Sequence, residues 1–136
     1  MGDEPLIVLD THVLIWWLTG GTSLSRAAKL AVAKAAKQSQ VVASAISVLE
    51  IVTAVRRGRL EFSSPVEQWL ADVRRLPELR FEPVSAEIAH LAGSFGEDMH
   101  GDPADRIIAA TAIMLNAALV TADGKLRASR AVKTIW

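Results

Sequence analysis

Short, unbroken apolar segments alternate with longer helix-like segments, and this alternation restricts the fold of the chain more than any other feature. Leu6–Leu9 and Val41–Ala43 are apolar at every position, as expected for strands buried on both faces of a sheet. Pro83 confines another strand-like segment to an edge or an end of the sheet, because proline lacks the backbone N–H that a ladder needs. The segments that favour strands are 6–9, 41–43, 80–84, 118–121 and 132–136.

Capping residues mark the helices that separate these strands. Ser25, Ser85 and Asp102 are placed to cap helices at their amino ends, and Gly58 is placed to end one. The segment 64–67, Ser-Pro-Val-Glu, has the spacing of a capping box. Helices are predicted over 11–18, 25–37, 46–57, 85–94 and 102–116, with one more that begins at 64–67. Strands that alternate with helices predict a three-layer α/β/α sandwich with a mostly parallel central sheet, formed by residues 1–136 as one domain.

The composition excludes several classes of protein. The chain has 136 residues, of which 51% are hydrophobic, so it can bury a core and is not intrinsically disordered. The absence of cysteine excludes a disulfide scaffold, a thiolate zinc site and an iron–sulfur cluster. A net charge of zero argues against a uniformly basic nucleic-acid binder. No apolar segment approaches the ~20 residues of a membrane span, and the acidic start lacks the basic region of a signal peptide, so we expect a soluble, cytoplasmic protein.

Four carboxylates lie beside apolar segments, where an unpaired buried charge costs several kcal/mol. Asp10 and Asp123 lie just past the ends of predicted strands, at the sheet edge that carries the ligand crevice of parallel sheets. Asp105 lies in the first turn of a predicted helix, where the helix dipole favours an ionised carboxylate. Glu50 lies within the otherwise apolar helix segment 46–52. We expect all four to converge at one end of the sheet.

A cluster of carboxylates without cysteine favours Mg²⁺ or Mn²⁺, because hard cations select oxygen ligands. Such a site lowers the pKa of a bound water, orients that water and stabilises the leaving oxygen of a phosphodiester. The sequence therefore predicts a metal-dependent phosphodiesterase.

Structural roles stay open for the same acids. An Asp after a strand is often a helix N-cap, and Asp102 in particular favours capping over metal binding. Glu50 lies two turns before Arg57 on one helix face, so an ion pair between them is the alternative to a catalytic role.

Four short motifs occur in the order, and on the element types, of a known family. Leu9-Asp10-Thr11, segment 47–50 (Ser-Val-Leu-Glu), segment 102–106 (Asp-Pro-Ala-Asp-Arg) and segment 120–123 (Val-Thr-Ala-Asp) resemble the acidic motifs of PIN-domain nucleases. They are most similar to those of the VapC toxins of type II toxin–antitoxin systems, over about residues 6–136. The resemblance implies an α/β/α fold and an endoribonuclease that depends on Mg²⁺ or Mn²⁺ and often cleaves structured RNA such as tRNA. It also implies a small cognate antitoxin and a homodimer.

The resemblance carries over to individual acids. Asp10, Glu50, Asp105 and Asp123 match the catalytic acids of the family. We interpret Asp10 as the central metal ligand, with Asp105 and Asp123 completing the shell directly or through water. Glu50 is interpreted as the group that holds a metal-bound water or acts as general base.

Polar neighbours of these acids are candidates for supporting roles. Thr11 and Thr121 are predicted to orient carboxylates, and Ser47 shares the helix face of Glu50. Asp102 is an additional acid that only some members of the family carry, and His12 either reaches the site or points into the core.

RNA brings phosphates, so cations are expected near the acids. Arg57 follows Glu50 and Lys125 follows Asp123, and both are predicted to contact RNA. His100, in the loop before the third motif, is a weaker candidate for a substrate contact. Trp16 and Trp17 cannot face the same way, so one is expected in the core and the other exposed, as core packing or as an interface anchor.

Three other readings remain open. A dehalogenase-type phosphatase also begins with a strand that ends in Asp, but it needs a second acid where this chain has His12. A receiver domain has an acidic pocket of similar size, but its central acid follows a strand, whereas Glu50 lies in a predicted helix. A PIN fold without the toxin role is the third, either as a nuclease that processes RNA without an antitoxin or as a binding or scaffold module, although such modules tend to lose the site acids and this chain keeps four.

Overall fold

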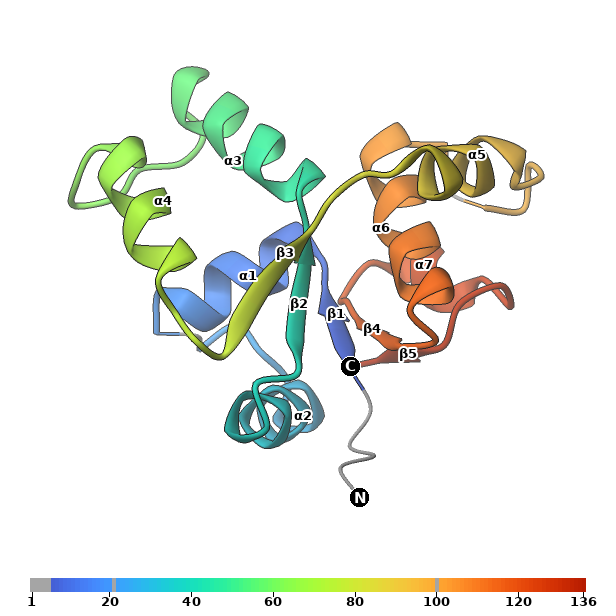
Figure 1. The fold of residues 1–136 in the computed structure, drawn as a ribbon, viewed down its shortest axis with the longest axis horizontal. Coiled ribbons are helices and arrows are strands. Elements are labelled where there is room, and N and C mark those ends of the chain that lie inside the picture. Colours follow the sequence, from blue (N-terminus) through green and yellow to red (C-terminus); the bar gives the residue numbers. More distant parts are fainter. Residues whose placement is uncertain (1–5, 21, 100) are drawn as a thin grey trace.

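The computed structural model describes residues 6–20, 22–99 and 101–136, in which five strands form one parallel sheet (Figure 1). The strands are β1 (Ile7–Leu9), β2 (Val41–Ser44), β3 (Leu79–Glu82), β4 (Ala118–Val120) and β5 (Thr134–Ile135). The helices are α1 (Thr11–Leu18), α2 (Arg26–Lys37), α3 (Ile46–Arg56), α4 (Val66–Arg74), α5 (Ala86–Ser94), α6 (Pro103–Met114) and α7 (Gly124–Ala128). The strand order is β3-β2-β1-β4-β5, with Leu9 opposite Ala43 of β2 and Val120 of β4.

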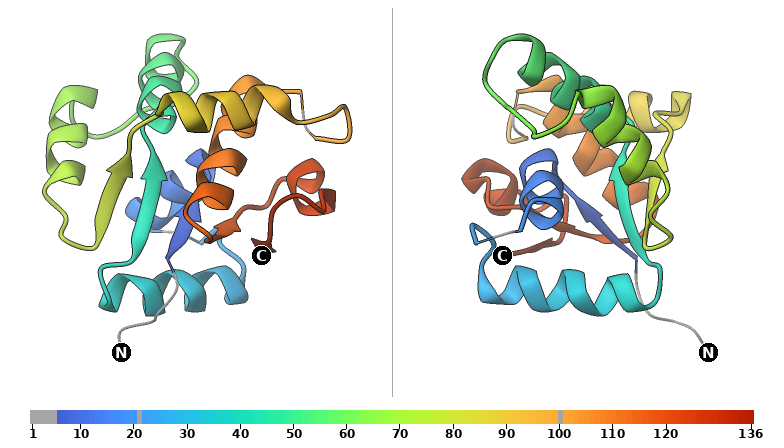
Figure 2. Two further views of the ribbon diagram at one scale, coloured as in Figure 1. Left: turned by 45° about the vertical axis from the view of Figure 1, so that its right-hand side comes forward. Right: turned by 90° about the vertical axis from the view of Figure 1, so that its left-hand side faces the viewer.

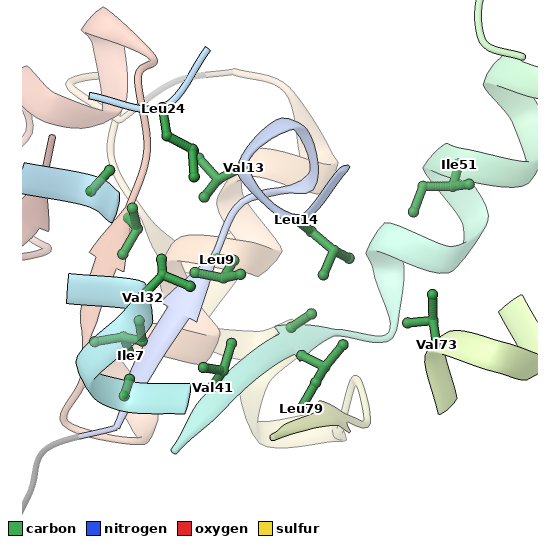
Figure 3. Packing of buried hydrophobic residues seen from close by; sticks show 14 residues of the cluster. Ile7, Leu9, Val13, Leu14, Leu24, Val32, Val41, Ile51, Val73 and Leu79 are labelled. Atoms are coloured by element: carbon green, nitrogen blue, oxygen red, sulfur yellow. The ribbon is translucent and has the colours of Figure 1, made fainter. Parts of the chain in front are cut away.

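Helices cover both faces of this sheet, so the predicted three-layer α/β/α fold is confirmed (Figures 1 and 2). Side chains alternate along a strand, and β1 sends Ile7 and Leu9 to one face and Val8 to the other. The first face packs against α1, α2, α3 and α4, as the labelled side chains of Figure 3 show. The second face packs against α6 and α7, while α5 packs on the outer side of α6.

The order in which the chain adds strands to the sheet reverses at β1. From β1 it proceeds outward to β2 and β3, and it then returns to place β4 against the other side of β1. In open parallel sheets such a reversal leaves a crevice beyond the carboxyl ends of the two central strands. That crevice is where Asp10 follows β1 and where Thr121 follows β4.

Most elements lie where the sequence predicts them. Pro83 directly follows β3, which is an edge strand as expected. Ser25 and Ser85 accept the predicted capping hydrogen bonds, and Gly58 follows α3 with φ of +72°. The capping box at 64–67 is wrong: Pro65 is the N-cap residue of α4, and no side chain caps that helix. Helix α7 is an element that the sequence interpretation missed.

No helix in the described part of the chain is long and apolar enough to cross a membrane. Residues 1–5, on which the prediction about a signal peptide rests, lie outside the described residues, as does His100.

Candidate active site

One cleft brings together every acid that the sequence singled out. It has a volume of about 400 Å³ and lies beyond the carboxyl ends of β1 and β4. The carboxylates on its wall are Asp10, Glu50, Asp102, Asp105 and Asp123. The other lining residues are Thr11, His12, Trp16 and Ala122. Side chains from α1, α3, α6 and the β4–α7 connection therefore meet here, although they are more than a hundred residues apart at the extremes.

Asp10 is the most buried of these acids, with 7% of its surface exposed. It follows β1 directly and caps α1, because its Oδ1 accepts the backbone N–H of Val13 at 2.9 Å. Burial raises the pKa of Asp10 above its ordinary value, and the charge of Asp123 raises it further. Hydrogen bonds from Thr121 and Val13, together with the field of His12, act in the opposite direction.

Thr121 connects two of the acids. Its hydroxyl donates to Asp10 Oδ2 and accepts the backbone N–H of Asp123 at 3.0 Å. The side chain is fully buried, so these two partners complete its hydrogen bonding. Thr121 therefore fixes the position of Asp10 relative to the start of the segment that carries Asp123.

Thr11 and Ser47 hold Glu50 in the same way. Thr11 donates its hydroxyl hydrogen to Glu50 Oε1. The Thr11 and Ser47 hydroxyl oxygens are 2.8 Å apart, so Ser47 donates to Thr11 while Thr11 donates to Glu50. The alternative ion pair between Glu50 and Arg57 is not formed in the described part of the chain.

Glu50 is half-buried, and its environment disfavours the charged form. Burial raises the pKa of Glu50, and the nearby carboxylates of Asp102 and Asp10 raise it further. The hydrogen bond from Thr11 and the field of His12 lower it. Glu50 therefore lies close to two other carboxylates, those of Asp102 and Asp10, instead of being separated from them.

Three of the acids also cap helices, as the structural alternative predicted. Asp102 Oδ1 accepts the N–H groups of Ala104 and Asp105 at 2.8 and 3.2 Å at the start of α6. Asp123 Oδ1 accepts two N–H groups at 2.9 and 3.0 Å at the start of α7. With Asp10 on α1, three helix amino ends point their positive dipole ends at one cleft, which stabilises negative charge there.

A family model described as "PIN domain" matches residues 7–131. The chain belongs to the PIN-domain family. Over 132 residues this PIN domain is 33% identical to Ribonuclease VapC22 of Mycobacterium tuberculosis (strain ATCC 25618 / H37Rv), an alignment that covers 96% of this chain and 98% of that protein.

Two solved structures with the same fold match almost the whole chain. One is VapBC2 from Rickettsia felis bound to a DNA fragment from their promoter, with a TM-score of 0.68 and 18% identity over 95% of this chain and 97% of the other. Another is FitAcB from Neisseria gonorrhoeae, with a TM-score of 0.61 and 24% identity over 95% and 96% of the two chains. These likenesses establish the PIN fold independently of the sequence motifs.

The donor set of this PIN domain suits a hard cation. Its cleft offers carboxylate and hydroxyl oxygens, with no sulfur and with His12 as the only imidazole among the described lining residues. No group of three or more His, Asp or Glu side chains in the described part of the chain is placed so that it could hold a metal ion. What the cleft shares with Mg²⁺ sites is the chemistry of its donors, because Mg²⁺ binds oxygen ligands, keeps several waters and takes only one or two protein carboxylates besides substrate phosphate.

A second, larger cavity of about 690 Å³ adjoins the acidic cleft of the PIN domain. Arg57, the C-cap residue of α3, lines it, and so does Arg59. Lys125 is exposed on α7 and lines neither cavity. Its backbone N–H contacts Asp123, so its predicted RNA contact depends on how far a substrate extends over α7.

The aromatic residues of α1 differ from expectation. Trp16 and Trp17 are both half-buried and both pack against the same core cluster, so neither is the exposed anchor. Trp16 lines both the acidic cleft and the adjoining cavity, a role that was not predicted. The spacing from His12 to Trp16 is i to i+4, which places both on one helix face. This spacing was the sequence signal from which their shared position at the cleft could have been predicted.

Proposed function

We propose that this PIN domain is the endoribonuclease toxin of a toxin–antitoxin pair and hydrolyses RNA phosphodiester bonds with Mg²⁺ or Mn²⁺. The observation that carries the proposal is the convergence of Asp10, Glu50, Asp105 and Asp123 on one cleft at the reversal point of a parallel sheet. A relative 33% identical over almost the whole chain is named a ribonuclease of the VapC group, which supports RNA as the substrate.

The chemistry assigns each acid a task. A bound divalent cation supplies Lewis-acid polarisation of a phosphoryl oxygen and activation of a water. In our proposal Asp10, Asp105 and Asp123 would hold such a cation, directly or through its bound waters, and Asp102 would be a further oxygen donor at the rim. Thr121 keeps Asp10 in position, so that carboxylate does not swing away when the cleft is filled.

Glu50 is proposed as the general base. Thr11 occupies Oε1, so Oε2 is the atom that takes the proton from the attacking water. A pKa raised by burial brings a carboxylate closer to neutral pH, where it accepts a proton more effectively than an ordinary glutamate does. Ser47 donates to the Thr11 hydroxyl oxygen, so the hydroxyl hydrogen of Thr11 stays directed at Glu50.

The partners follow from the relatives. The matched structures include a toxin–antitoxin complex from Klebsiella pneumoniae and VapBC2, which supports a small antitoxin as the partner that covers the cleft. We further propose that the chain acts in the cytoplasm on structured RNA such as tRNA, and that it forms a homodimer.

Cleavage of RNA by the purified chain tests the proposal. We expect Mg²⁺- or Mn²⁺-dependent cleavage of a total tRNA preparation, measured by gel electrophoresis, which EDTA stops and which Asp10→Asn reduces to the level of the EDTA control. Glu87→Gln is the matched control, because Glu87 is an exposed acid on α5 outside the cleft. Full activity of the Asp10→Asn chain would contradict the proposed site.

Growth of cells that express the chain tests the toxin assignment separately. We expect induction of the wild-type chain to arrest a bacterial culture, and the Asp10→Asn chain to leave growth unchanged. Coexpression of a cognate antitoxin should restore growth. RNA cleavage in vitro without growth arrest would favour the reading as a processing nuclease that has no antitoxin.

A further inference from the structure

We propose that the cavity beside the acidic cleft is a nucleotide subsite, in which one unpaired nucleobase lies against His12 and Trp16 and the next phosphate lies near Arg57 and Arg59. The inference rests on the proposed function, because it takes RNA as the substrate. It adds a binding determinant that the acids do not provide.

The two cavities form one continuous surface. Thr11, His12, Trp16, Glu50 and Asp102 line both the acidic cleft of about 400 Å³ and the cavity of about 690 Å³. An RNA strand whose scissile phosphate lies at the acids therefore continues into the larger cavity. That volume falls within the roughly 300–1,000 Å³ typical of small-molecule sites, so a nucleotide fits it.

Two aromatic side chains, His12 and Trp16, lie where the two cavities join and form what we call the aromatic wall. The His12 and Trp16 rings have centroids 5.8 Å apart and are tilted by 44°, so His12 does not stack over the Trp16 face. Trp136, which follows β5, supports Trp16, with centroids 6.0 Å apart. Trp16 is half-buried and therefore held in place by packing, whereas His12 is exposed and accessible to a ligand. Unpaired RNA bases are commonly held by stacking on such side chains, histidine included.

The rest of the larger cavity suits a base and its phosphate. Its floor includes the apolar side chains of Ile15, Leu49 and Ile51, which can cover a nucleobase but cannot solvate a phosphate. Arg57 and Arg59 are exposed on the same lining, so cations are available for the phosphate that follows. The acids repel a polyanion at the neighbouring cleft, and these two arginines offset that repulsion along the path of the strand.

A protein segment is the other possible occupant of a partly apolar cavity. RNA is favoured because the cavity opens onto the acids, and His12 and Trp16 line both, so a strand that extends from the acids into the cavity passes these two rings. In this assignment Arg57 and Arg59 contact the backbone phosphates of the RNA strand.

Binding of a short RNA tests the subsite. The probe is a fluorescein-labelled, single-stranded 12-nucleotide RNA of mixed sequence, followed by anisotropy in Mg²⁺ on the Asp10→Asn chain so that the probe stays intact. We expect Trp16→Ala to weaken binding by roughly 5- to 150-fold, the range for loss of one stacked base, and to leave the salt dependence unchanged. We expect Arg57→Ala with Arg59→Ala to reduce the slope of log K against log salt by about 1.4.

Two further variants keep the test decisive. Trp17→Ala removes a half-buried indole from the same helix outside both cavities, so it should bind the probe normally while it lowers the melting temperature as Trp16→Ala does. His12→Ala changes an exposed residue, so it should fold normally and weaken binding even if Trp16→Ala does not fold.

The outcomes separate this inference from the proposed function. Unchanged probe binding by His12→Ala and by folded Trp16→Ala would overturn the subsite, even where the wild-type chain cleaves RNA. Trp16→Ala that binds the probe normally but no longer captures the antitoxin would assign the cavity to protein and also overturn it. Loss of probe binding in a chain whose wild type cleaves no RNA would support the subsite and contradict the nuclease proposal.

Discussion

Replacement of Thr121 by valine isolates the hydrogen bonds that hold the acids in place. Thr121 is fully buried, and its hydroxyl links Asp10 Oδ2 to the backbone N–H of Asp123. Valine has nearly the same shape, so Thr121→Val keeps the packing and removes only the polar connection. The variant therefore measures what that connection contributes to stability and to the position of the carboxylates.

The expected loss of stability follows from the two bonds. A hydrogen bond to a charged group contributes about 1.5–3 kcal/mol, and a buried N–H left without a partner costs about 1–3 kcal/mol. Asp10 keeps its second bond, to the N–H of Val13, so the two effects do not add fully. We expect the free energy of unfolding to fall by about 3 kcal/mol at pH 7.5. We expect a smaller loss at pH 4 than at pH 7.5, because the raised pKa of Asp10 increases the protonated fraction as the pH falls, and a protonated carboxyl depends less on the donor.

Urea denaturation followed by tryptophan fluorescence measures the change. Thr111→Val is the matched control, because Thr111 is equally buried but donates only to the Ile107 carbonyl one turn earlier in α6. That carbonyl keeps its helical hydrogen bond, so we expect this control to change stability by less than about 1 kcal/mol. Thr121→Ser should retain most of the stability that Thr121→Val loses. Equal losses in Thr121→Val and Thr111→Val would refute the reasoning.

Other consequences of the geometry can be measured on the same chain. In EDTA, the free energy of unfolding should decrease as pH rises from 4 to 8. The raised pKa values of Asp10 and Glu50 make the folded state bind more protons than the unfolded state, so the loss of those protons costs stability. An increase in the free energy of unfolding over that range would contradict the pKa directions. Asp10→Asn should abolish any increase in melting temperature that Mg²⁺ produces at pH 7.5, whereas a wild-type-like response to Mg²⁺ would remove Asp10 from the metal site. Gly58→Ala should destabilise the chain by about 1 kcal/mol in urea denaturation, because φ is +72° there. Gly93→Ala, in the last turn of α5 with open space at the Cβ position, should instead stabilise it by roughly 0.5 kcal/mol. The same sign for both glycines would show that backbone conformation does not decide the effect.

The sequence carried most of the fold because strands and caps are local signals. Runs such as Leu6–Leu9 are apolar throughout, which a strand buried on both faces requires, and Ser25 and Ser85 cap their helices as predicted. Helix α7 was missed because it has five residues and a single buried side chain, Leu126, so it shows no amphipathic period. Its signal was the capping capacity of Asp123, which the structural alternative had recognised.

The candidate site was predictable to the extent that its residues followed strands or began helices. Asp10 and Asp123 could be placed at the sheet edge from their positions alone. The cavity of Trp16, by contrast, depends on how α1 lies against α3 and α6, and no local pattern contains that information. For the same reason the sequence allowed an ion pair between Glu50 and Arg57, which the structure replaces with a bond from Thr11.

Capping and metal binding are not competing roles for the acids of this cleft. Capping uses Oδ1 of Asp10, Asp102 and Asp123 and fixes each carboxylate against the positive end of a helix dipole. The dipoles reduce the repulsion among the acids, but the pKa values of Asp10 and Glu50 are still raised, by burial first and by the neighbouring carboxylates second. A fold stabilised only for itself would replace these two acids by neutral residues, because burial disfavours their charged forms. Since a bound cation would favour those charged forms, stability that increases with Mg²⁺ more at pH 7.5 than at pH 5 is the expected signature of a site arranged for a metal rather than for folding.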